Sequence, residues 1–177
     1  MLKLAVIILS VCYPFGVYWG LQHYEAKLIL PLLLVFLGIR WIAIGNRSER
    51  YVVIVTLLLV VFIAVFYGEQ LGLKFYPVMM NLGFLFLFVG SLFSSASFVE
   101  RLARLSEPDL PPKAVIYTRK VTWVWSVFFL VNGSVAAATA LWATNEIWLL
   151  YNGLIAYLMM GLLAGGEWLV RQRVRNV

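Results

Sequence analysis

The chain has 177 residues, of which 63% are hydrophobic and only 12% are charged. A soluble domain is nearer to half apolar and about a quarter charged, so this chain has too few charges to cover a water-facing surface. The composition therefore excludes an ordinary soluble globule and indicates a membrane protein.

Six apolar blocks of spanning length follow one another along the chain. They cover roughly residues 4–21, 28–45, 51–68, 75–98, 121–143 and 147–170. A helix needs about 20 mostly apolar residues to cross a bilayer, and backbone groups in lipid must be satisfied within their own segment. We therefore expect an all-α fold: a polytopic transmembrane helix bundle of about six spans, forming a single integral membrane domain over 1–177. The first block lacks the small-residue cleavage site of a signal peptide and is expected to be retained.

If the amino terminus lies in the cytoplasm, nearly all basic residues fall on the cytoplasmic side of the membrane. Only Lys27 and Lys74 then face outside. The cytoplasmic set is Lys3, Arg40, Arg47, Arg50, Arg101, Arg104, Lys113, Arg119, Lys120, Arg171, Arg173 and Arg175. This positive-inside pattern predicts that both termini are cytoplasmic. Because the charge is spread over the whole cytoplasmic face, it fits membrane topology and anionic lipid rather than nucleic acid.

The stretch 99–120 is the main cytoplasmic loop in this topology. It begins with Val99, Leu102 and Leu105 on one helical face and Arg101 and Arg104 on another, a pattern typical of a short amphipathic helix in the headgroup layer. Pro108, Pro111 and Pro112 are expected to stop that helix. The loop is either a solvated connector whose charges set the topology, or a docking surface for anionic lipid headgroups or an acidic carrier protein. The candidate contact residues are Arg101, Arg104, Lys113, Arg119 and Lys120.

Few polar residues lie inside the apolar blocks. Arg40 and Glu167 lie at similar depth near the inner ends of the second and sixth blocks, where they either pair or reach the interface separately. Asn81, Asn132 and Asn152 lie deeper. Their amides are expected to bond between helices, and the alternative is a polar site that holds a headgroup or a hydroxyl.

Small and aromatic residues have positions that fit a helix bundle. Gly16 and Gly20, and likewise Gly161 and Gly165, are four residues apart. This spacing allows close helix contacts, either within one chain or between two copies in a homo-oligomer. Most aromatic residues, Tyr117 among them, lie near block boundaries and are expected in interfacial belts.

No catalytic or metal-binding constellation is recognisable. His23 is the only histidine and Cys12 the only cysteine, which is too few for a metal cluster or a nucleophile–histidine–acid set on one side of the membrane. The sequence also has no glycine loop for phosphates. We expect no cofactor, and the sequence favours a protein that is not an enzyme, with an acyl transferase as the alternative.

The carboxyl half resembles a family of small bacterial inner-membrane proteins that are often encoded beside ketosynthase and aryl-polyene genes. The resemblance covers about residues 75–170 and rests on these motifs: Tyr76-Pro77, Glu100 to Leu105, Leu110-Pro111, Tyr117-Thr118-Arg119, Thr122, Trp125, Phe128-Phe129, Asn132-Gly133, Thr139-Ala140, Trp148 and Leu150 to Gly153. More distantly, the length and block order are similar to those of the intracellular septation protein A family, although the Tyr-Thr-Arg and Tyr-Asn-Gly motifs depart from it. Neither family supplies a catalytic residue.

These resemblances imply a multi-pass protein of the bacterial inner membrane with a role in the cell envelope. The leading hypothesis is a non-catalytic accessory or scaffold protein in envelope lipid or aryl-polyene assembly, which contacts anionic phospholipid or an acidic partner, such as an acyl carrier, through the 99–120 loop. One alternative is a carrier or flippase-like protein for an amphipathic lipid, with a polar site at Asn81, Asn132 and Asn152. Another alternative is a protein of envelope or septation maintenance.

Overall fold

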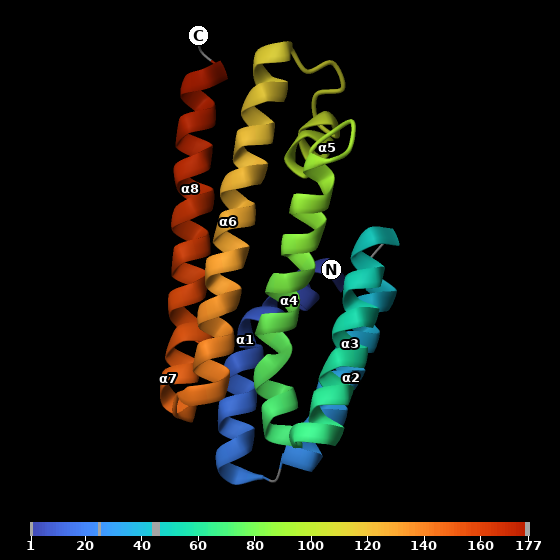
Figure 1. Cartoon of the computed structure of the whole chain (residues 1–177), viewed down its shortest axis with the longest axis vertical. Helices are drawn as coiled ribbons and strands as arrows, with labels where there is room; N and C mark the ends of the chain where they lie inside the picture. Colours follow the sequence, from blue (N-terminus) through green and yellow to red (C-terminus); the bar gives the residue numbers. More distant parts are fainter. Residues whose placement is uncertain (1, 25, 44–46, 176–177) are drawn as a thin grey trace.

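The structure, a computed structural model, describes residues 2–24, 26–43 and 47–175, and every regular element in this part of the chain is helical. In chain order the elements are α1 (Leu2–His23), α2 (Ala26–Ala43), α3 (Arg47–Tyr67), α4 (Glu69–Leu92), α5 (Phe98–Arg104), α6 (Pro112–Trp142), α7 (Asn145–Leu149), the π-helix η1 (Leu150–Ile155) and α8 (Ala156–Arg175). The long helices run up and down as a bundle, with α5 at one end and α7 at the other (Figure 1). The expected all-α fold is confirmed.

Three helical segments in the described residues are long and apolar enough to cross a membrane. They are Glu69–Leu92, Pro112–Trp142 and Asn145–Gln172, and the apolar part of α3, Val53–Tyr67, is shorter. Many large apolar side chains on these helices are exposed, including Phe86, Val124 and Leu162. An apolar surface of this extent suits lipid rather than water, so the chain is a membrane-embedded helical protein.

The boundaries of α6 differ from the expected fifth span. The helix begins at Pro112 and not near residue 121, with Pro111 as its N-cap. The prolines were expected only to stop a helix. At the first helical position, however, proline is favourable, because its missing N–H would have no partner there and its φ is already helical. Residues 112–120 of the expected loop therefore form the first turns of α6, and α5 accounts for residues 98–104.

Helix α4 lies at the centre of the bundle and packs against α3 and α6 on opposite sides (Figure 1). Its contact with α3 is close, because a Cβ atom at Gly72 would lie 2.7 Å from Cβ of Ala64 and 3.0 Å from the carbonyl oxygen of Val60. The turn that joins the two helices uses Gly68 at φ 101°, a conformation that favours glycine. The buried core beside this contact includes Val60, Leu73, Trp148, Leu37 and Val53.

We predict that Gly72→Ala destabilises the protein by about 1–3 kcal/mol, because the added methyl group overlaps the backbone of α3. Gly90 is a matched control in the same helix, since nothing lies within 4 Å of its Cβ position. Gly90→Ala should leave the thermal unfolding midpoint unchanged or raise it. Thermal unfolding of the purified protein in detergent measures both, and equal midpoints for the two variants would contradict this packing.

Candidate functional site

A groove of about 500 Å³ opens at the α5 end of the bundle, between α4, α5, α6 and α8. We call it the aromatic groove. Helix α4 contributes Phe84 and Phe88, and α8 contributes Glu167 and Arg171. The residues from α5, its following loop and α6 are Phe98, Val99, Leu102, Ala103, Ser106, Glu107, Leu110, Ala114, Tyr117, Thr118, Val121, Trp125 and Phe129. The stretch 99–120 therefore forms much of one wall.

The inner surface of the groove is a stack of aromatic rings. Phe84 and Phe129 stack with ring centroids 5.3 Å apart, and Phe88 lies 5.1 Å from Phe129 and 4.4 Å from Phe98. Trp125 completes the set at 5.7 Å from Phe129. Residues four apart lie on one face of a helix, so Phe84 and Phe88 on α4 meet Trp125 and Phe129 on α6. The result is an apolar surface of flat rings.

The rim of the groove is polar and joins α6 to α8. The hydroxyl of Tyr117 lies 3.3 Å from both the backbone carbonyl and Oε1 of Glu167. Nε of Arg171 lies 3.7 Å from the same Oε1. Ser106 and Glu107 add further polar groups to the lining of the groove. A groove with aromatic walls and a polar rim can receive a hydrocarbon chain and leave the polar end of the molecule at the surface.

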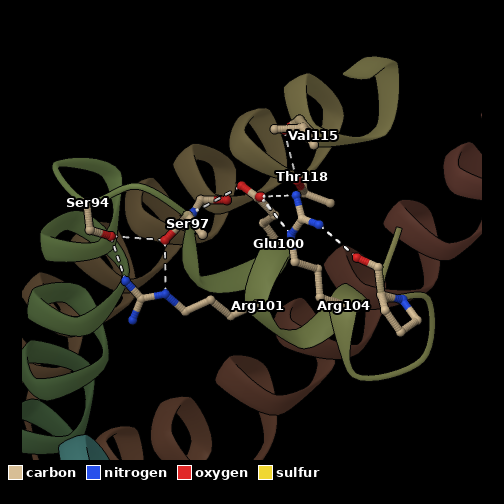
Figure 2. A network of polar contacts seen from close by, with 9 residues as sticks. Ser94, Ser97, Glu100, Arg101, Arg104, Val115 and Thr118 are labelled. Atoms are coloured by element: carbon tan, nitrogen blue, oxygen red, sulfur yellow. Dashed lines mark hydrogen bonds and ion pairs between the residues drawn. The ribbon is translucent and has the colours of Figure 1, made fainter. Parts of the chain in front are cut away.

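Three predicted contact residues of the 99–120 stretch bind the protein's own backbone and side chains. Arg101 donates to the hydroxyl of Ser94 at 2.6 Å and to the carbonyl of Ala96 at 3.0 Å. Arg104 forms an ion pair of 2.9 Å with Glu100 and donates to the carbonyl of Pro108. Figure 2 shows these two arginines on either side of α5.

The third arginine, Arg119, reaches from α6 to the end of α4 and donates to the carbonyl of Leu92 at 2.7 Å. Leu92 is the last residue of α4, so the guanidinium satisfies a terminal carbonyl and complements the helix dipole. Together Arg101, Arg104 and Arg119 fix the turn between α4, α5 and α6, which we call the arginine corner. Lys113 and Lys120, the other two predicted residues, are exposed on α6.

The three intramembrane amides divide into two groups. Asn132 donates to Oδ1 of Asn81 at 2.9 Å and accepts from the hydroxyl of Tyr151 at 2.9 Å, and Asn81 donates to the carbonyl of Pro77. Asn152 instead donates to Oγ1 of Thr139 and to the carbonyl of Trp148. The amides thus link helices, and the structure does not bring all three to one site.

The proposed pairing of Arg40 with Glu167 falls partly outside the described residues, because the side chain of Arg40 is among those the structure does not describe. Glu167 has contacts of its own with Tyr117 and Arg171. Among the described residues, no group of three or more potential metal-ligating side chains comes together.

Sequence reasoning missed the aromatic groove and the role of Tyr117. The available signal was the spacing of four between Phe84 and Phe88 and between Trp125 and Phe129. That spacing predicts a shared face on each helix, but it does not tell which two faces meet.

We predict that Asn132→Leu lowers the stability of the protein by about 1–2 kcal/mol, because Asn81 and Tyr151 each lose a hydrogen-bond partner inside the bundle. Ser134 lies on the same helix, is exposed and bonds only its own helix, to the carbonyl of Leu130. Ser134→Ala is therefore the control and should unfold like the native protein. Thermal unfolding in detergent distinguishes the two, and an unchanged midpoint for Asn132→Leu would contradict a stabilising amide contact.

Comparison with protein-family models, with curated proteins and with solved structures finds no match to this chain.

Proposed function

We propose that this chain is a non-catalytic accessory or scaffold protein of the bacterial inner membrane, which holds an amphipathic molecule during envelope lipid or aryl-polyene assembly. The observation that carries the proposal is the aromatic groove, about 500 Å³ in volume, with an apolar interior and a polar rim. The groove is formed in part by the 99–120 stretch, the segment in which the sequence concentrates charge and proline.

The membrane topology that we propose has six spans, with both termini in the cytoplasm. The carboxyl end of α8 and the arginine corner lie at the same end of the bundle (Figure 1), and the positive-inside pattern assigns that end to the cytoplasm. The aromatic groove then opens on the cytoplasmic side, where new lipid-like chains are made. Lys74 lies at the opposite end, near the start of α4.

The contents of the groove follow from its surface. Flat aromatic rings contact a hydrocarbon or polyene chain through dispersion and exclude water from it. The rim offers a hydroxyl, two carboxylates and one guanidinium, from Tyr117, Glu107, Glu167 and Arg171, which suits the polar end of the same molecule. Because Arg101, Arg104 and Arg119 hold the arginine corner, the exposed Lys113 and Lys120 are the better candidates for contact with an anionic partner such as an acyl carrier.

We predict that a side chain that fills the groove displaces its ligand. Ala114 lies in the groove wall on the first turn of α6, so Ala114→Phe should remove the lipid-like molecule that copurifies with the native protein in mild detergent. Val124 is 51% exposed on the outer side of α6, and Val124→Phe adds a similar ring there without entering the groove. Mass spectrometry of the copurified material compares the three proteins.

The cellular test uses the same pair of variants. Cells with Ala114→Phe should contain less of the envelope product than cells with Val124→Phe, at equal amounts of membrane protein. If native protein and both variants copurify with the same molecules in the same amounts, the groove is not a binding site and the proposed function is wrong.

A further inference from the structure

Lys74 has a buried side chain, and the described part of the chain provides no direct partner for its ammonium. It lies in the second turn of α4 and is only 6% exposed. Lysine is almost never this buried unless it is paired. The carboxylate of Glu146 acts on Lys74 electrostatically, but among the described residues no ion pair within 4.0 Å and no hydrogen bond reaches the Lys74 ammonium. The stem of Lys74 is thus packed inside the bundle, while its ammonium reaches a pocket where an anion can contact it.

Lys74 lines a pocket of about 560 Å³ at the end of the bundle opposite the aromatic groove. The other lining residues are Tyr67, Gly68, Glu69, Gln70, Leu71 and Ala140. The pocket thus lies over the turn between α3 and α4 and beside the last part of α6. It has room for a small headgroup next to the Lys74 ammonium.

The same pocket contains the amino terminus of α4. Gly68 is the N-cap of this 24-residue helix and makes no side-chain cap. The N–H groups of the first turn have no partners inside the helix, and they carry the positive end of the helix dipole. Backbone donors and a lysine ammonium that line one pocket form a site for phosphate oxygens.

Neighbouring helices hold this part of α4 in place. Nε1 of Trp148, which is fully buried, donates to the carbonyl of Lys74 at 3.2 Å. The hydroxyl of Tyr13 donates to the carbonyl of Leu73 at 2.7 Å. Gln70 at the pocket wall is tied to Asn145 of α7 by a bond of 3.3 Å. The site is therefore preorganised, which lowers the cost of ordering it around a ligand.

The position of the pocket matches the depth of lipid headgroups. Tyr67 and Trp142, which end α3 and α6 at this end of the bundle, are 71% and 82% exposed, as expected of aromatic residues in the membrane interface. The nearby carboxylates of Glu69 and Glu146 disfavour ligands with several negative charges. A phosphodiester, with one negative charge, suits the site better than a phosphomonoester.

We propose that Lys74 and the first turn of α4 bind a phosphate group, and that a phosphodiester is the preferred form. A lipid headgroup and a soluble phosphate would both supply this chemistry. The site is independent of the aromatic groove, because it lies at the other end of the bundle and shares no lining residue with it.

The test measures thermal unfolding of the full chain in detergent, with and without glycerophosphoglycerol, a phosphodiester headgroup that has no hydrocarbon chain for the aromatic groove to hold. The unfolding midpoint of the native protein should rise with the concentration of this ligand, because a ligand that binds only the folded state stabilises it. Lys74→Met should lose this rise, with an apparent Kd weakened by about tenfold or more. Without ligand, Lys74→Met should be at least as stable as the native protein, because an apolar chain of similar shape replaces the packed stem of the lysine.

Control variants test where the phosphate group binds, and a second ligand tests whether that group comes from a lipid headgroup or from soluble phosphate. Lys113→Met removes the same charge at the α5 end of the bundle and should keep the rise, as should Ala114→Phe in the aromatic groove. Inorganic phosphate that raises the midpoint of native protein but not of Lys74→Met would support the site and assign it to soluble phosphate. If Lys74→Met keeps the rise while Lys113→Met loses it, or if neither ligand stabilises native protein, the proposal is wrong.

Discussion

The close contact between α4 and α6 at Asn81 and Gly133 determines the arrangement of the rest of the bundle. A Cβ atom at Gly133 would lie 3.0 Å from Cβ of Asn81, so the missing side chain is what allows the two helices to approach. One turn further along each helix, the same faces bring Phe84 onto Phe129 at 5.3 Å. The hydrogen bond from Nδ2 of Asn132 to Oδ1 of Asn81 favours this register, because a shift between the helices would leave these two atoms without each other as partners inside the bundle. The aromatic groove is a consequence of this register.

A positively charged side chain lies near each end of α4, and the two charges interact with the helix dipole in opposite ways. At its carboxyl end, Arg119 donates to the last carbonyl, so a positive charge meets the negative end of the helix dipole. At its amino end, Lys74 places a positive charge within two turns of the positive end. The first arrangement is stabilising and the second is not. A lysine whose packed stem brings an unpaired ammonium to a pocket is more informative about ligand binding than the stabilising arginines, whose contacts are already complete.

The sequence predicted the helical blocks well because continuous apolar runs leave the backbone no alternative to a helix in lipid. It predicted boundaries less well: Pro112 was expected to stop a helix, yet it begins α6, and a proline's effect depends on whether it occupies the first turn or the interior.

The candidate site was predicted only in part. The 99–120 stretch does line the groove, but through Val99, Leu102 and Tyr117, since the arginines turn toward carbonyls whose positions no sequence pattern contains. The sequence identifies Lys74 as one of the two basic residues expected on the outer side of the membrane. It does not predict that the side chain of Lys74 is buried, because that burial depends on how α1 and α7 pack against α4.

Helix α8 is packed tightly at its start and loosely along its middle. Residues Leu150–Ile155 form a π-helix, whose wider turn shifts the following helix relative to an ordinary α-helix, and such turns often occur at functional sites. Gly153 within it is packed against the ring of Phe15, where a Cβ atom would lie 3.2 Å away, so this end of the segment is held tightly. Beyond it, Leu158, Leu162 and Leu169 are exposed, and nothing lies within 4 Å of a Cβ position at Gly161 or Gly165. The contact from Tyr117 to Glu167 joins α8 to α6 again at the far end. Helix α8 therefore reaches the groove only at its far end, where Glu167 and Arg171 form part of the rim and the contact with Tyr117 holds them beside α6.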